Sequence, residues 1–110
     1  MNQTLEITTS FHGLWLLGYA GESATYPVAI RQEGERITGA FLEPGNARPL
    51  ATFEGHVEGI RLKARFRSLR SEDSGVFTVY YDGSDSFDGE IITCRSDGQT
   101  QVLDLHGTHL

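Results

Sequence analysis

The sequence predicts an all-β protein that folds as an eight-stranded antiparallel up-and-down (meander) barrel, and three observations lead to this prediction. No stretch of the 110 residues has helical periodicity. Thirteen glycines divide the chain into short segments in which apolar and polar residues alternate, as in half-buried strands. Each segment can pair with the next so that both contribute to one apolar face. Closing such a sheet removes its long edges. A two-layer sandwich is the alternative.

The eight segments follow one another with short connections, so we expect one domain over residues 1–110, with residues 1–11 as an N-terminal arm. Residues 4–8 of this arm also alternate, which predicts a short additional strand. The eight strands are expected at residues 13–20, 24–32, 35–43, 50–57, 60–67, 76–82, 86–95 and 100–108.

Turn residues predict how the strands pair. With Glu58-Gly59 as a two-residue loop, Val57 faces Ile60, and the apolar residues of that hairpin share one face. A loop at Glu33-Gly34 has the same effect, although it sets Arg31 opposite Arg36, an unfavourable like-charge pair. The other hairpins are expected to pair Trp15 with Ile30, Phe66 with Phe77, Tyr81 with Phe87, and Ile91 with Leu105.

The charge balance argues against a general nucleic-acid-binding protein. Nine Lys and Arg residues face fifteen Asp and Glu residues, for a net charge of −6, whereas phosphate binding needs a basic face. The local exception is the basic run at residues 61–70, which we interpret as a solvated strand face. The single Cys94, the lack of an apolar span and an N-terminus unlike a signal peptide predict a cytoplasmic protein without membrane contact.

The tripeptide Gly13-Leu14-Trp15 opens the first strand of the expected meander. Residues 11–109 thereby resemble the calycin superfamily of lipocalins, fatty-acid-binding proteins and avidins. The resemblance implies a barrel whose base is closed by Trp15 and which holds a small molecule. The chain departs from the avidin pattern, because no Asn and Ser follow Trp15 at positions suited to biotin and no second tryptophan exists. Biotin binding is therefore not expected.

Loop lengths predict where a ligand binds. The connections at residues 20–25, 44–49 and 67–76 are long and leave the barrel at one end, which suggests a mouth. Small residues lie halfway down and no inward position is charged, so an apolar or aromatic ligand is expected, with tyrosine hydroxyls as polar handles. The alternative is that the aromatic rings fill the core. The candidate ligand-binding residues are Tyr19, Tyr26, Phe41, Phe53, Phe66 and Phe77.

No motif for catalysis, cofactor or metal stands out, and we predict neither a cofactor nor a metal. His106 is expected across from Glu90, as a surface pair. Residues 82–90 are acidic and glycine-rich, but their spacing does not fit a calcium-binding loop. Ser71, Ser74 and Cys94 have no base that could activate them.

Several apolar residues are expected on the outer face of the barrel, where closure would bring the first, seventh and eighth strands together. A contiguous apolar patch marks an interface, and it predicts a homo-oligomer; coverage by residues 4–8 is the alternative. The patch residues are Leu14, Leu16, Ile92 and Val102.

Three functions remain open from the sequence. The first is a binding protein for a small apolar or aromatic molecule. The second is a cyclase- or isomerase-type enzyme that acts by positioning its substrate, with Tyr19, Tyr26 and Tyr81 as the inward acid–base groups. The third is an interaction or regulatory module that uses the outer patch or the long loops.

Overall fold

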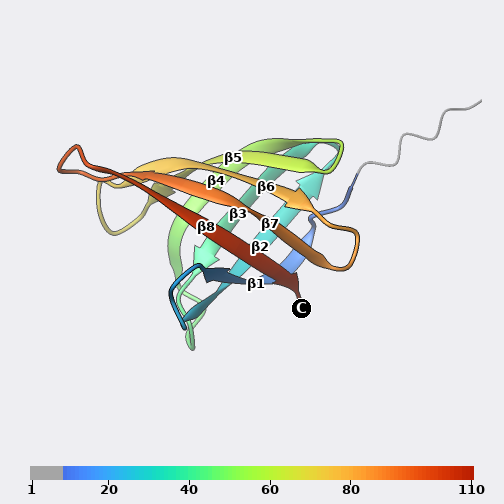
Figure 1. Cartoon of the computed structure of the whole chain (residues 1–110), viewed down its shortest axis with the longest axis horizontal. Helices are drawn as coiled ribbons and strands as arrows, with labels where there is room; N and C mark the ends of the chain where they lie inside the picture. Colours follow the sequence, from blue (N-terminus) through green and yellow to red (C-terminus); the bar gives the residue numbers. More distant parts are fainter. Residues whose placement is uncertain (1–8) are drawn as a thin grey trace, which may run out of the picture.

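A computed structural model describes residues 9–110, and in it the chain forms a closed antiparallel barrel in which each strand pairs with the next and β1 pairs with β8 (Figure 1). This confirms the predicted meander barrel and rules out the sandwich. The strands are β1 (Gly13–Tyr19), β2 (Thr25–Glu33), β3 (Arg36–Leu42), β4 (Pro49–Glu58), β5 (Arg61–Ser68), β6 (Ser74–Tyr81), β7 (Ser86–Cys94) and β8 (Thr100–His109). The strand expected at residues 4–8 lies outside the described residues.

The described chain contains no helix long and apolar enough to cross a membrane. All of its regular structure is strand. The polypeptide therefore builds its core only from the inner face of the sheet and from segments that pack against the ends of the barrel.

The β6–β7 hairpin pairs as predicted, with Tyr81 opposite Phe87. The other predicted pairings are wrong by two residues. Trp15 faces Val28 instead of Ile30, Phe66 faces Gly75 instead of Phe77, and Ile91 faces Leu103 instead of Leu105. Because side chains alternate with a period of two, a shift of two keeps the inward residues inward wherever they remain within a strand.

Glycine position explains the shift at the two tight turns. Gly34 and Gly59 have φ angles of 62° and 61° and are the first, not the second, residue of their two-residue loops. A glycine there fits the type II′ turn, whose twist matches that of the strands. Val57 consequently faces Leu62, and Ile60, expected inside, lies in the turn and is 54% exposed.

The same correction removes the like-charge pair expected at the β2–β3 hairpin. Arg31 faces Thr38, and Arg36 faces Glu33. The register that the glycine sets is thus also the electrostatically favourable one for this hairpin.

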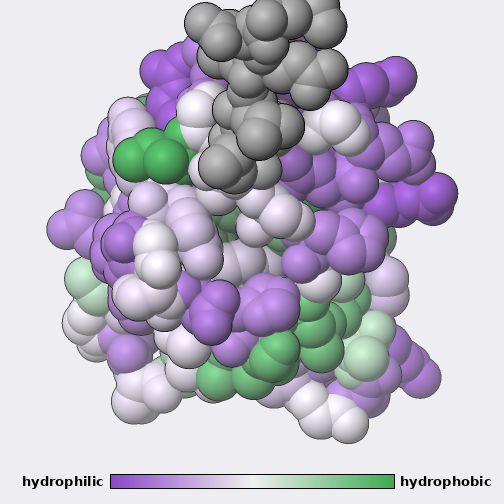
Figure 2. Space-filling model, turned by 90° about the vertical axis from the view of Figure 1, so that its right-hand side faces the viewer, coloured by the Kyte–Doolittle hydropathy of each residue, from purple (hydrophilic) through white to green (hydrophobic). Residues whose placement is uncertain are grey.

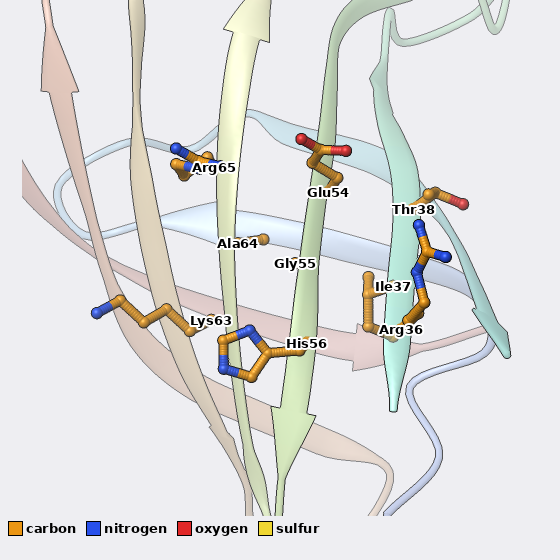
Figure 3. A pocket seen from close by; sticks show the side chains of 9 residues that line it. All are labelled: Arg36, Ile37, Thr38, Glu54, Gly55, His56, Lys63, Ala64 and Arg65. Atoms are coloured by element: carbon orange, nitrogen blue, oxygen red, sulfur yellow. The ribbon is translucent and has the colours of Figure 1, made fainter. Parts of the chain in front are cut away.

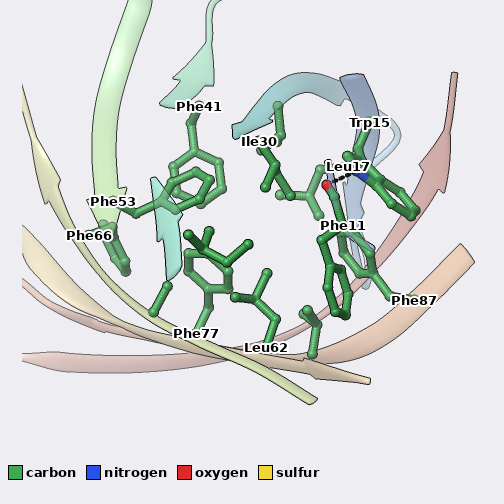
Figure 4. Close-up of a cluster of buried hydrophobic side chains, with 14 of the residues drawn as sticks. Phe11, Trp15, Leu17, Ile30, Phe41, Phe53, Leu62, Phe66, Phe77 and Phe87 are labelled. Carbon is green, nitrogen blue, oxygen red and sulfur yellow. Dashed lines mark hydrogen bonds between the residues drawn. The ribbon is translucent and has the colours of Figure 1, made fainter. Parts of the chain in front are cut away.

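Two groups of aromatic rings fill the barrel, one toward each end, with Ile30 and Leu62 between them (Figure 4). No polar or charged residue is buried among the described residues. One group consists of Phe11, Trp15 and Phe87, and the other of Phe41, Phe53, Phe66 and Phe77.

Phe11 closes the end of the barrel at which the tight turns lie. It was expected in an N-terminal arm, yet its side chain is fully buried, 6.3 Å from the Trp15 ring and 6.1 Å from the Phe87 ring. The Trp15 indole N–H donates a hydrogen bond of 2.8 Å to the Phe11 carbonyl, and the Phe11 amide donates one of 2.7 Å to Gln32. Residues 9–11 are therefore held against the barrel. We call this the sealed end.

Candidate functional site

The opposite end of the barrel is less well covered, and we call it the open end. The longer connections leave the strands there. Burial decreases toward it: Leu62 and Val79 are 0% exposed, whereas Phe41 and Ala51 are 8% and Phe66 is 9% exposed. Among the buried core residues, none covers these side chains in the way that Phe11 covers those at the sealed end. The core therefore approaches solvent at this end.

Tyr19, from the last position of β1, and Tyr26, near the start of β2, lie at the open end. Both are half-buried and pack in an edge arrangement with ring centroids 5.8 Å apart. Burial, followed by the proximity of Tyr26 and Glu22, raises the pKa of Tyr19 to about 12. The Tyr19 hydroxyl therefore keeps its proton at neutral pH and is available as a hydrogen-bond donor.

Beneath the tyrosines, the four predicted phenylalanines form one cluster. Phe53 and Phe77 are 5.0 Å apart between centroids, Phe41 and Phe53 are 5.2 Å apart, and Phe41 and Phe66 are 6.0 Å apart. Aromatic pairs at such distances are in favourable contact. Thus the structure brings these four side chains together and places them against one another.

The small residues halfway down the barrel do not leave an empty space beside them. A Cβ atom added to Gly39 would come within 2.3 Å of the Phe53 ring. A Cβ atom on Gly55 or Gly89 would collide with backbone of the neighbouring strand, at 2.0 Å and 1.9 Å. The missing side chain leaves room for the Phe53 ring at Gly39 and for the neighbouring strand at Gly55 and Gly89. Any ligand at the open end would rest on the phenylalanine cluster and not below it.

Tyr81 is not part of this group. It lies at the sealed end, where its ring is 6.1 Å from the Phe11 ring and its hydroxyl accepts a hydrogen bond of 3.4 Å from the Asp85 amide. The three tyrosines considered for catalysis therefore do not share one site.

A second hollow lies on the outer face of the barrel, across β3, β4 and β5, and was not anticipated from the sequence (Figure 3). The register arranges the outward side chains here in cross-strand rows, namely Arg36–His56–Lys63 and Thr38–Glu54–Arg65. The residues between these rows, Ile37, Gly55 and Ala64, are inward positions, so their backbone forms the floor of the hollow. We call this hollow, of about 370 Å³, the outer trough.

His106 also lies on the outer face, but its partner differs from the expected one. The β7–β8 register puts His106 opposite Asp88, with 2.6 Å between Nδ1 and Oδ1, while Glu90 faces Asp104. The Thr108 hydroxyl is 3.5 Å from His106 Nε2. Both members of the pair are exposed, on open sheet, where such pairs contribute little.

The four outer apolar residues do not form the single patch that was expected. Leu16 pairs with Thr108 of β8, whereas Ile92 pairs with Val102, which lies six residues earlier in β8. At about 3.4 Å per residue, roughly 20 Å separates the two groups.

Leu14 and Leu16 belong instead to an apolar area over β1, β2 and β3, which we call the β1–β3 face. Figure 2 shows hydrophobic surface gathered low on the view, at the height of β1 and the C-terminus in Figure 1. The strand register brings its members together, and the Leu110 amide donates a hydrogen bond to the Leu14 carbonyl. The members are Leu14, Leu16, Pro27, Ala29, Ala40 and Leu110.

In residues 9–110, no three His, Cys, Asp or Glu side chains are grouped so that they could hold a metal ion. No protein-family model matches the chain, and the search of curated proteins finds no match to it.

Proposed function

We propose that this protein is a calycin-like binding barrel that takes a small apolar or aromatic molecule at its open end. The observation that carries the proposal is the unequal covering of the core. Phe11 covers one end, where Trp15 is 1% exposed, whereas Phe41 and Phe66 at the other end are 8% and 9% exposed and the tyrosines there are half-buried. Apolar side chains that approach solvent beside polar groups are typical of ligand sites.

The chemistry of the open end fits such a ligand. The aromatic cluster supplies an apolar floor that would stack against or pack under a ring. Tyr19, with its pKa raised to about 12, supplies a hydroxyl donor that stays protonated at neutral pH. In this proposal the ligand contacts Tyr19 and Tyr26 first and the rings beneath them second; the full set is Tyr19, Tyr26, Phe41, Phe53, Phe66 and Phe77.

Titration with the neutral fluorescent probe N-phenylnaphthylamine tests this proposal. We expect saturable binding that Tyr26→Ala weakens about tenfold or more, because a buried aromatic contact is removed. Tyr26→Phe should bind nearly as well as the wild type, because it removes only a hydroxyl. The matched control is Tyr80→Ala, since Tyr80 is 49% exposed on the outer face. Equal binding by the Tyr26→Ala and wild-type proteins would contradict the proposal.

We also propose that the barrel self-associates through the β1–β3 face. Leu14 is 44% exposed and the C-terminal Leu110 is 64% exposed. The small side chains Ala29 and Ala40 continue the Leu14 row across the sheet and line a shallow apolar hollow with it. A second copy can cover such a surface by two-fold symmetry.

A further inference from the structure

We propose that the outer trough over β3–β5 binds a small multivalent oxyanion, with Arg36, Lys63 and Arg65 as its cationic contacts. This site is separate from the open end, because its charged and polar side chains occupy the outward positions of β3–β5 (Figure 3). It is therefore independent of the function proposed above.

The first support is a concentration of cationic side chains on one part of the outer face. Arg36 and Lys63 flank His56 in one cross-strand row, and Arg65 lies two residues from Lys63 on the same face of β5. Cross-strand neighbours have Cβ atoms only about 5 Å apart, so these long side chains can reach one bound anion.

The second support is that these cations form no ion pair, although Glu33 faces Arg36 and Glu54 faces Arg65. Among residues 9–110, Arg31, Arg61 and Arg70 form ion pairs with glutamates, but Arg36, Lys63, Arg65 and Arg67 have no carboxylate oxygen within 4.0 Å, and neither have Arg48 and Arg95 outside the trough. This is unexpected in a chain with fifteen acidic residues and a net charge of −6. Glu58, the carboxylate nearest His56 at 3.5 Å, is already shared with Arg61 at 2.6 Å.

The third support is the shape of the trough. Between the two cross-strand rows, Ile37, Gly55 and Ala64 are inward positions, so strand backbone forms the floor and the outward side chains flank it (Figure 3). Lys63 stands in one row and Arg65 in the other, so an anion lying along the floor can contact both. A volume of about 370 Å³ suits a small molecule.

The identity of the side chains points to phosphate or clustered carboxylate groups. Guanidinium groups bind such oxyanions through paired hydrogen bonds, and Lys63 adds a compact charge. The neighbouring Thr38 offers a hydroxyl donor. Single-stranded nucleic acid is disfavoured, because no Phe, Tyr or Trp on the outer face of β3–β5 could stack against a base. Glu54 opposes Arg65 and should weaken binding.

Calorimetric titration with inorganic tripolyphosphate and with citrate, at fixed ionic strength, tests the site. We expect saturable binding of at least one of them, weakened about tenfold by Arg36→Gln and by Lys63→Gln, because each removes a charge-assisted hydrogen bond. Glu54→Gln should tighten binding. The control is Arg95→Gln, which removes an exposed cation outside the trough. Binding of tripolyphosphate alone would identify a phosphate site, and binding of citrate alone a carboxylate site.

A thermal measurement separates ligand binding from folding. In the absence of ligand, Lys63→Gln should leave the unfolding midpoint nearly unchanged, because Lys63 is exposed and forms no ion pair among residues 9–110. Tripolyphosphate or citrate should stabilise the wild type more than this variant. The proposal is overturned if neither anion binds saturably, or if Arg95→Gln weakens binding as much as Lys63→Gln does.

Discussion

Phe11 seals one end of the barrel although it lies outside every strand. Its ring contacts Trp15, Tyr81 and Phe87, and its carbonyl satisfies the buried indole N–H of Trp15. A small barrel has few buried side chains, so a single large ring at its end contributes much of the apolar burial there.

We expect Phe11→Ala to lower the free energy of unfolding by about 3–5 kcal/mol, as for other fully buried phenylalanines. Urea unfolding measures this change, and the emission of Trp15 should shift toward that of a solvated indole. Phe11→Leu is the matched variant and should lose less than half as much. A loss below about 1 kcal/mol for Phe11→Ala would show that the sealed end is not part of the stable core.

Tyr19 predicts a specific dependence of stability on alkaline pH. Its pKa is raised from 10.0 to about 12, mainly by burial, so the folded state keeps a proton that the unfolded state releases. The stability associated with Tyr19 is therefore complete below about pH 10 and declines as the pH rises through about 12. Tyr19→Phe has no such proton to lose. Urea unfolding across this range should show a steeper decline for the wild type; parallel curves would refute the assignment.

The hairpin turns determine the register of the sheet. Gly34 and Gly59 each occupy the first position of a two-residue loop, with positive φ. Positive φ is a conformation that residues with a Cβ atom avoid at a cost of about 1–2 kcal/mol. Two registers of each hairpin would give the same alternation of apolar and polar residues. The observed register is the one that puts the glycine at the turn position that needs a positive φ.

We expect Gly59→Ala to destabilise the protein by about 1–2 kcal/mol, because alanine is strained at a φ of 61°. Gly59→Asn should cost less, since asparagine tolerates this region better. Ile60→Ala is the control at the adjacent turn position, where the side chain is 54% exposed, and it should change stability by less than about 0.5 kcal/mol. Thermal and urea unfolding of the three variants would check this order.

At the scale of the whole molecule, the two ends and the two sides of the barrel differ in character. One end is sealed and the other reaches solvent. The β1–β3 face is apolar, while the adjoining outer trough carries cations. In a closed barrel, each strand points its outward side chains in a different direction. Separate parts of the outer surface can therefore differ in chemical character.

Self-association through the β1–β3 face predicts a clear difference between two variants. Leu14→Glu places a charge in the proposed interface and should reduce the molar mass in light scattering to that of a monomer. Val102→Glu changes an apolar residue that is 57% exposed and lies about 20 Å from Leu16 along β8, and it should leave the mass unchanged. A wild-type protein that stays monomeric at high concentration would refute the interface.

The meander barrel, the inward faces and the aromatic group at the open end follow from the sequence. Alternation with a period of two defines which side chains share a face, and closure then places Tyr19, Tyr26 and the four phenylalanines inside. The error of two residues in most pairings did not disturb this conclusion, because it preserves parity. The buried phenylalanine at position 11 gave no such signal, since one aromatic residue outside a strand has no periodicity.

Sequence alone determined which strand residues face the barrel interior, because local alternation is sufficient to separate the two faces of a strand. Only the tertiary structure decided what lies side by side on the outside. A two-residue shift in register changes every cross-strand neighbour, and so the row Arg36–His56–Lys63 and the division of the outer apolar residues into two groups emerged only with the closed sheet.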